Sequence, residues 1–77
     1  MKVKILAFGQ IAEITKNHTW IMDAPKTSAD LVNQLETDFP ELKELSYAIS
    51  INKRIIHEPC LLQEMSEIAL LPPFSGG

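Results

Sequence analysis

The sequence predicts an α+β domain in which a mixed sheet of four to five strands packs on one main helix. Three observations lead to this fold class. Apolar and polar residues alternate at the start of the chain and again over residues 47–52, which is typical of strands. Residues 27–39 carry one apolar stripe with helical spacing. The length of 77 residues allows one domain with a small core, so we expect a single domain over residues 1–77.

Two strands are predicted before the helix. In residues 2–8 the apolar side chains at odd positions are expected to face the core, and the two lysines are expected to face water. Gly9 breaks this run, and residues 11–16 fit a helical turn and a loop equally well. Residues 19–22 contain β-branched and aromatic side chains and predict a second strand, antiparallel to the first.

The main helix is predicted to begin after Thr27, because threonine caps the amino ends of helices. Asp30 follows three residues later, near the positive end of the helix dipole. Pro40 is expected to end the helix, since it disfavours helical geometry in the preceding residue. The apolar stripe consists of Leu31, Val32, Leu35 and Phe39. One helix covers one face of a sheet, so the other face is expected to be partly exposed for partners.

Three further strands are predicted after the helix, over residues 47–52, 54–56 and 67–71. Tyr47, Ile49 and Ile51 alternate with polar or small residues and are expected to point inward. Asn52 and Lys53 predict a turn between the first two of these strands.

Composition and charge exclude several classes of function. Seven basic and ten acidic residues give a net charge of −3, which argues against binding to nucleic acid or to anionic membranes. No apolar run approaches the ~20 residues that span a bilayer. Cys60 is the single cysteine, so an internal disulfide is excluded and a reducing compartment is favoured. We therefore expect a cytoplasmic protein that binds neither nucleic acid nor membrane.

Few residues suggest catalysis or metal binding. His18 and His57 lack the spacing of metal ligands and are expected to be solvated, and Cys60 is expected to be a partly buried, inert thiol. No metal site is expected. An acidic cluster near the end of the helix is interpreted as a solvated face, with a docking patch for a basic partner as the alternative. Its members are Glu36, Asp38, Glu41 and Glu44.

The end of the sequence is its most unusual part. Pro72 and Pro73 follow an apolar strand directly and stiffen the chain in an extended form. Phe74 is an apolar residue beyond the last strand, and two glycines end the sequence. Residues 72–77 would span roughly 20 Å when extended. We expect a flexible tail here that carries a terminal carboxylate into the cleft of another protein.

With this tail, the sequence resembles the small subunit of molybdopterin synthase, a ubiquitin-like sulfur carrier with the β-grasp fold. The resemblance covers the whole chain. It rests on residues 8–13, on the helix after Thr27, on the turn at residues 51–53 and above all on Pro-Pro-Phe-Ser-Gly-Gly at residues 72–77. One departure is that Met65-Ser66-Glu67 stands where the family usually has Gly-Asp-Glu. A looser turn is therefore expected before the last strand.

The resemblance implies a chemistry for the C-terminal carboxylate of Gly77. In the family, an adenylating enzyme similar to ubiquitin-activating enzymes uses ATP to convert this carboxylate into an acyl-adenylate. Sulfur from a persulfide then displaces AMP and leaves a thiocarboxylate. The thiocarboxylate donates its sulfur to cyclic pyranopterin monophosphate in molybdenum cofactor biosynthesis. The resemblance thus implies a sulfur-donating subunit of a heterotetramer that holds no cofactor itself, with the catalytic residues on the large subunit.

Each tail residue receives an expected role. Gly77 carries the reactive group, and Gly76 and Ser75 deliver it. Outward apolar residues beside the tail are expected to contact the large subunit, because a partner would cover them: Leu71, Pro73 and Phe74. Three alternatives remain open, namely a sulfur carrier of the thiamine pathway, a ubiquitin-like protein modifier, and a binding module that uses only its free sheet face.

Overall fold

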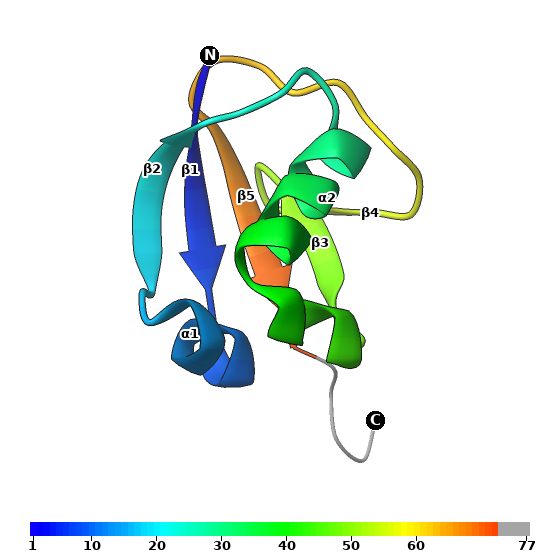
Figure 1. Cartoon of the computed structure of the whole chain (residues 1–77). Helices are drawn as coiled ribbons and strands as arrows, with labels where there is room; N and C mark the ends of the chain where they lie inside the picture. Colours follow the sequence, from blue (N-terminus) through cyan, green and yellow to red (C-terminus); the bar gives the residue numbers. More distant parts are fainter. Residues whose placement is uncertain (73–77) are drawn as a thin grey trace.

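A five-stranded mixed sheet carries one long helix across one of its faces (Figure 1). The computed structural model describes residues 1–72. The elements are β1 (Lys2–Ala7), α1 (Gly9–Thr15), β2 (Thr19–Asp23), α2 (Ser28–Asp38), the 3-10 helix η1 (Pro40–Glu44), β3 (Ala48–Ile51), β4 (Arg54–Ile56) and β5 (Ser66–Leu71). The strand order is β2-β1-β5-β3-β4, with β1 and β5 parallel and every other pair antiparallel. None of the helices formed by residues 1–72 combines the length and apolar character needed to cross a bilayer.

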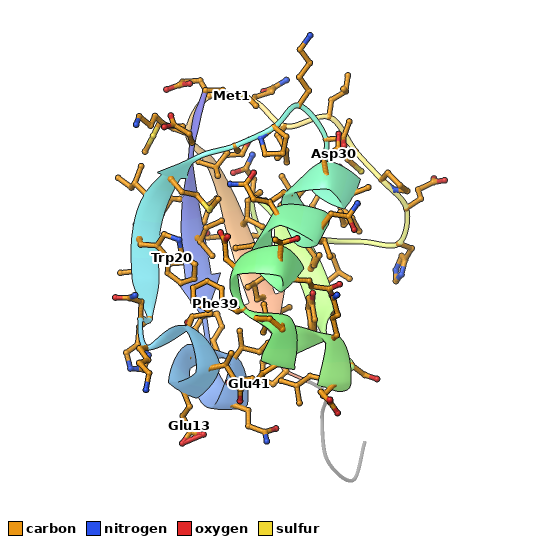
Figure 2. The ribbon with its side chains drawn as sticks, in the orientation of Figure 1. Met1, Glu13, Trp20, Asp30, Phe39 and Glu41 are labelled. Carbon is orange, nitrogen blue, oxygen red and sulfur yellow. The ribbon has the colours of Figure 1, made fainter. Side chains whose placement is uncertain are left out.

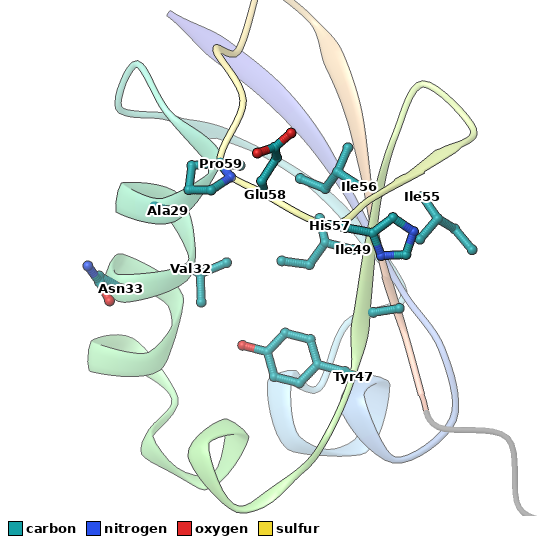
Figure 3. Close-up of a pocket in the computed structure, with 12 residues that line it drawn as sticks. Ala29, Val32, Asn33, Tyr47, Ile49, Ile55, Ile56, His57, Glu58 and Pro59 are labelled. Atoms are coloured by element: carbon teal, nitrogen blue, oxygen red, sulfur yellow. The ribbon is translucent and has the colours of Figure 1, made fainter.

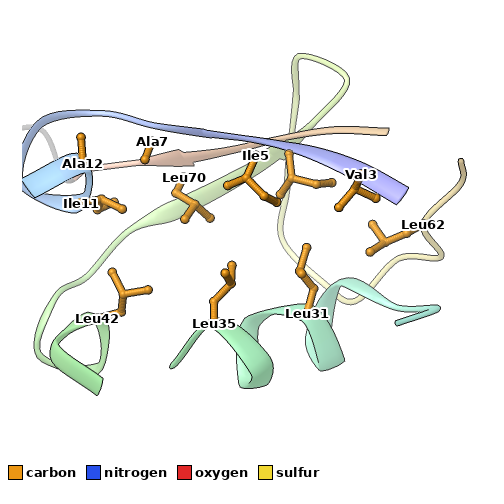
Figure 4. Packing of buried hydrophobic residues seen from close by; sticks show 11 residues of the cluster. Val3, Ile5, Ala7, Ile11, Ala12, Leu31, Leu35, Leu42, Leu62 and Leu70 are labelled. Carbon is orange, nitrogen blue, oxygen red and sulfur yellow. The ribbon is translucent and has the colours of Figure 1, made fainter. Parts of the chain in front are cut away.

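The core lies between the sheet and α2. Val3 and Ile5 are fully buried, which confirms the predicted alternation in β1. Leu31 and Leu35 project from α2 toward the sheet and are 1% exposed, so the centre of the apolar stripe is also confirmed (Figure 4). Such burial of aliphatic side chains is the main source of stability in a small domain.

Two residues of the predicted stripe, Val32 and Phe39, are only half-buried. Val32 faces a groove beside β3 and β4 instead of the closed core. Phe39 follows the end of α2 and meets Trp20 of β2 edge to face, with ring centroids 6.5 Å apart (Figure 2). This geometry is favourable for aromatic pairs, so Phe39 closes the open side of the core at β2.

The predicted limits of the main helix are confirmed. Thr27 Oγ1 accepts a hydrogen bond from the backbone N–H of Asp30 at 3.2 Å, as expected of a capping threonine. The helix ends at Asp38, and Phe39 leaves helical geometry with φ −130° and ψ 79°. Pro40 then starts η1, a short 3-10 helix over Pro40–Glu44.

The segment that the sequence leaves undecided forms α1. Its cap residue Phe8 makes no side-chain cap hydrogen bond, which explains why no start signal is visible in the sequence. Ile11, Ala12 and Thr15 are buried, and the Thr15 hydroxyl donates to the carbonyl of Ile11 at 3.1 Å. Packing of these buried side chains against the rest of the fold therefore stabilises this short helix.

The inward residues of β3 are less buried than expected. The strand begins at Ala48, one residue after Tyr47, and both Ile49 and Ile51 are half-buried. Ser50, which points away from the core, is 6% exposed. It lies between Ala69 of β5 and Ile55 of β4, whose side chains cover it.

Hydrogen bonds close the turn before β5, for which the sequence predicts a geometry looser than that of the family. Met65 takes a left-handed conformation with φ 60°, which glycine adopts freely. Its N–H donates to the carbonyl of Lys2 at 2.6 Å. The Ser66 N–H donates to the Gln63 carbonyl at 3.0 Å, and the Ser66 hydroxyl oxygen accepts from the Gln63 N–H at 3.0 Å.

Replacing Met65 with glycine is expected to raise the free energy of unfolding by about 0.5–1 kcal/mol. The left-handed conformation costs an ordinary residue roughly 1–2 kcal/mol, and the entropy of glycine offsets only part of this gain. Met65 is 49% exposed, so little buried surface is lost. Urea unfolding measures the change, and the control Gln63→Gly should lower stability. A Met65→Gly protein less stable than wild type would contradict this account.

Candidate functional site

The candidate site is the carboxyl end of β5, where the chain leaves the sheet. β5 lies between β1 and β3 in the centre of the sheet. Leu70 is fully buried and pairs with Ala7 on one side and Ile49 on the other. Leu71 is the last residue of β5, pairs with Ala48 and is half-buried. The departing chain is therefore anchored by a fully buried residue one position before its end.

Gly9 lies beside Pro72, the residue that follows β5. A Cβ atom at Gly9 would lie 3.4 Å from Cγ of Pro72, and Gly9 has φ +55°. The left-handed start of α1 favours glycine at this position, whereas a Cβ atom would make only an ordinary van der Waals contact with Pro72. In the sequence, Gly9 marks only the end of a strand. The available signal was that it is the sole glycine among residues 1–72.

Most predicted site residues lie beyond the part of the chain that the structure describes. These residues are Pro73, Phe74, Ser75, Gly76 and Gly77, and their expected roles stay predictions. Leu71 is the one that can be placed. Because Leu70 points into the core, Leu71 points to the opposite side of the sheet, next to the point where the chain departs.

Among residues 1–72, no helix covers the side of the sheet opposite α2, called here the open face, as the sequence predicts (Figure 1). A row of outward-facing residues crosses the middle of this face. Each is paired with the next on the neighbouring strand, in the order Leu6, Ala69, Ser50 and Ile55. Ala69 is 7% exposed because its neighbours cover it, whereas Ile55 on the edge strand is 53% exposed. Leu71 continues this apolar area toward the end of β5. An apolar surface therefore lies beside the departing chain.

Charged side chains occupy the other end of the open face. Lys2 Nζ lies 3.1 Å from Asp23 Oδ1, and both side chains are largely exposed. Such an exposed pair contributes at most ~1 kcal/mol. Lys4 and Glu67 are paired neighbours in β1 and β5. The open face is thus polar at one end and apolar near the end of β5.

The histidines and the cysteine take the positions expected of them. His18 and His57 are exposed, and Cys60 is half-buried. The Cys60 thiol donates to the carbonyl of Glu58 at 3.3 Å. Within residues 1–72, no three side chains of the His, Cys, Asp and Glu types converge as metal ligands would.

One residue of the acidic cluster is not solvated. Asp38, Glu41 and Glu44 are exposed as expected, but Glu36 is half-buried and accepts the Tyr47 O–H at 2.7 Å. Burial, together with this hydrogen bond and the nearby carboxylate, raises the pKa of the Tyr47 hydroxyl above its ordinary value of 10.0. The pair links α2 to the start of β3.

Stability should therefore fall at alkaline pH through Tyr47. Below pH 10 both states hold the proton, so Tyr47 contributes no pH dependence there. Above it the unfolded chain releases the proton first, and the free energy of unfolding decreases. Urea unfolding at about pH 8 and about pH 11 measures the slope, which should be smaller in Tyr47→Phe. An equal slope in both proteins would show that Tyr47 does not cause it.

A groove of about 550 Å³ lies between α2 and the β3–β4 hairpin (Figure 3). Val32, Tyr47 and Ile49 contribute to its walls, and His57 and Glu58 also line it. The lining is mainly apolar.

Both the sequence and the fold are similar to known proteins. The model of the ThiS family matches residues 5–77. The molybdopterin synthase sulfur carrier subunit of Arabidopsis thaliana is 27% identical over 81 residues, which cover 100% of this chain and 84% of that protein. Both matches extend over β5 and the residues that follow it.

Solved structures agree with this similarity. A chain of the protein–protein complex of subunits 1 and 2 of molybdopterin-converting factor from Helicobacter pylori 26695 is 28% identical, with a TM-score of 0.74 and full coverage of both chains. Small archaeal modifier protein 1 from Methanosarcina acetivorans is 25% identical, with a TM-score of 0.84 and coverage of 99% and 96%. The expected ubiquitin-like β-grasp fold is confirmed.

Proposed function

Because the chain belongs to the ThiS family, we propose that it is the sulfur carrier subunit of a molybdopterin synthase. The observation that carries this proposal is the similarity, over the full length of the chain, to the Arabidopsis sulfur carrier subunit. The sequence Pro-Pro-Phe-Ser-Gly-Gly at residues 72–77 supports it, because two terminal glycines give a carboxylate the narrowest stalk a polypeptide can form.

The proposed chemistry takes place at Gly77. One carboxylate oxygen attacks the α-phosphate of ATP on an adenylating enzyme, and pyrophosphate leaves. A persulfide sulfur then attacks the activated carbonyl carbon, and AMP leaves with that oxygen. A thiol cleaves the resulting S–S bond, which yields the Gly77 thiocarboxylate and a disulfide on the donor side. The thiocarboxylate sulfur then bonds to cyclic pyranopterin monophosphate, and water cleaves its bond to the Gly77 carbonyl carbon, which restores the carboxylate.

The carrier is proposed to contribute no catalytic side chain to these steps. Gly76 and Ser75 would deliver the reactive end, and the large subunit would provide the catalytic residues. The Helicobacter complex of subunits 1 and 2 supports such a partner. We propose Leu71, Pro73 and Phe74 as contacts with the large subunit, because Leu71 adjoins the apolar part of the open face.

Replacing Leu71 with alanine should weaken binding to the large subunit by about tenfold, since buried apolar anchors at interfaces contribute more than ~1 kcal/mol each. The matched control is Leu61→Ala. Leu61 is 76% exposed and bridges Thr27 at the amino end of α2, away from the end of β5. Isothermal titration calorimetry measures both affinities. Equal affinities for the two variants would show that Leu71 does not contribute to the interface.

Retrieval of partners tests the proposed function as a whole. A tagged chain is expected to retrieve a large molybdopterin synthase subunit and an adenylating enzyme from its own cells. Mass spectrometry identifies the partners. Recovery of a thiazole synthase in place of the large subunit would show that the carrier serves the thiamine pathway and would refute the molybdopterin assignment.

A second candidate function is protein modification. The similarity to small archaeal modifier protein 1 from Methanosarcina acetivorans favours it. In this case the same activated Gly77 would form isopeptide bonds with lysines of other proteins. Tagged chain should then appear in larger conjugates that survive denaturation and reductant. If none appears while a thiocarboxylate is present, this alternative is rejected.

A further inference from the structure

The outer edge of β2 is open among the residues that the structure describes. β2 is the terminal strand of the sheet order, and within residues 1–72 it pairs with β1 alone. Figure 1 shows β2 at the margin of the sheet, with α2 on the other side of β1. A free strand edge is a template for a further strand.

The hydrogen bonds to β1 reveal which backbone groups of β2 point outward. At one end the Ala7 N–H donates to the His18 carbonyl at 2.8 Å, and at the other the Ala24 N–H donates to the Met1 carbonyl at 2.8 Å. Antiparallel pairs alternate between bonded and non-bonded residues. The register therefore directs the backbone groups of Trp20 and Met22 toward β1.

It follows that three residues present free N–H and C=O groups at the edge. They are Thr19, Ile21 and Asp23, the partners of non-bonded positions in β1. Common devices that block strand edges are missing from β2: it contains no proline and no lysine. Its one charged residue, Asp23, already forms an ion pair with Lys2.

We propose that two copies of the chain associate through this edge, as antiparallel β2 strands related by a two-fold axis at Ile21. In this register Ile21 lies opposite its own copy, and Thr19 lies opposite Asp23 of the second copy. Each of the three outward residues then donates one backbone hydrogen bond and accepts one. The pattern is self-complementary, as a two-fold interface requires.

The side chains match in the same register. Ile21, 58% exposed, would contact its copy on the open face. The Thr19 hydroxyl would donate to the Asp23 carboxylate beside it. On the opposite side of the strand, the half-buried Trp20 would lie against the half-buried Met22 of the second copy, and sulfur–aromatic contacts are favourable. Pairing would thus cover the exposed apolar side chains of β2.

The proposed dimer leaves the end of β5 accessible. β1 and β5 are parallel to each other and antiparallel to β2. Antiparallel pairing of the two β2 strands therefore sets the two β5 strands in opposite directions, with their carboxyl ends at opposite margins of a continuous sheet. The association is independent of the sulfur chemistry proposed above.

Sedimentation equilibrium tests the association on the purified chain. The expected result is an average mass that rises with concentration from 8.6 kDa toward twice that value, with a dissociation constant on the order of 100 µM for so small an interface. Ile21→Lys places like charges directly opposite each other and should weaken association by about tenfold or more. The control is Ile55→Lys, because Ile55 lies on the other edge strand and is 53% exposed, similar to Ile21. The Ile55→Lys protein should associate like wild type.

Amide hydrogen exchange locates the interface. The N–H groups of Thr19, Ile21 and Asp23 should become protected as concentration rises, whereas those of Trp20 and Met22 should be protected at every concentration. A wild-type mass that stays at 8.6 kDa into the millimolar range would overturn the proposal. The same result is expected if this edge pairs with a strand of a different protein. Equal weakening by both lysine variants, or protection at other amides, would overturn it as well.

Discussion

Removal of Gly77 is expected to abolish sulfur transfer by this chain. Deleting one residue retracts the carboxylate by about 3.5 Å, and a misplacement of about 1 Å can already reduce a reaction rate by about a hundredfold. We expect sulfur transfer in a reconstituted synthase assay to fall by at least about a hundredfold. The fold should be unchanged, because the deletion leaves the core formed within residues 1–72 intact.

The control for this deletion is Ser75→Ala, which keeps the length of the tail and both glycines. Its sulfur transfer is expected to stay within about threefold of wild type, because delivery by the tail depends on its length and its glycines, and the substitution removes only one hydroxyl oxygen. Unfolding curves of both variants should coincide with that of wild type. Normal sulfur transfer after deletion of Gly77 would contradict the role proposed for its carboxylate.

Replacing Leu70 with alanine is expected to have the largest effect on stability. Leu70 projects from β5 into the core and is 0% exposed, between its strand neighbours Ala7 and Ile49 (Figure 4). Loss of a buried leucine side chain costs about 2–5 kcal/mol because a cavity remains. Domains have a total stability of about 5–15 kcal/mol, and a domain this small lies at the lower end. Leu70→Ala should therefore be partly unfolded at 37 °C.

Urea unfolding followed by circular dichroism measures this loss. Leu61→Ala is again the matched control, because the same atoms are removed from a side chain that is 76% exposed. Its free energy of unfolding should change by no more than ~0.5 kcal/mol. Similar losses in the two variants would show that burial does not decide the stability of this domain.

The sequence predicts those elements whose signals are local. The alternation of buried and exposed residues in β1 is visible directly, and β4 has the predicted limits of residues 54–56. The capping residue Thr27 and the terminating Pro40 define α2 equally well. In each case a few neighbouring residues contain the whole signal.

Features that depend on distant contacts escape such local patterns. The contact of Pro72 with Gly9 joins residues at opposite ends of the chain, and the hydrogen bond of Tyr47 with Glu36 joins a strand start to a helix. The left-handed conformation of Met65 is imposed by hydrogen bonds at the turn, one of them to Lys2. These features depend on tertiary packing, which the local sequence does not specify.

At the end of the chain, the sequence is more informative about function than the structure is. Residues 73–77 provide the strongest functional signal in the sequence, and they lie outside the described residues. Of the predicted site, Leu71 alone can be placed. The structure adds what the motif does not contain, namely the contact between Gly9 and Pro72 and the apolar surface beside the end of β5.

The intact mass of the protein isolated from its own cells tests the central claim most directly. Sulfur carriage predicts a fraction whose mass is increased by the exchange of one oxygen for one sulfur, and fragmentation should assign this exchange to Gly77. The fraction should disappear when the adenylating enzyme is deleted. A single unmodified mass under conditions of active cofactor synthesis would contradict the account.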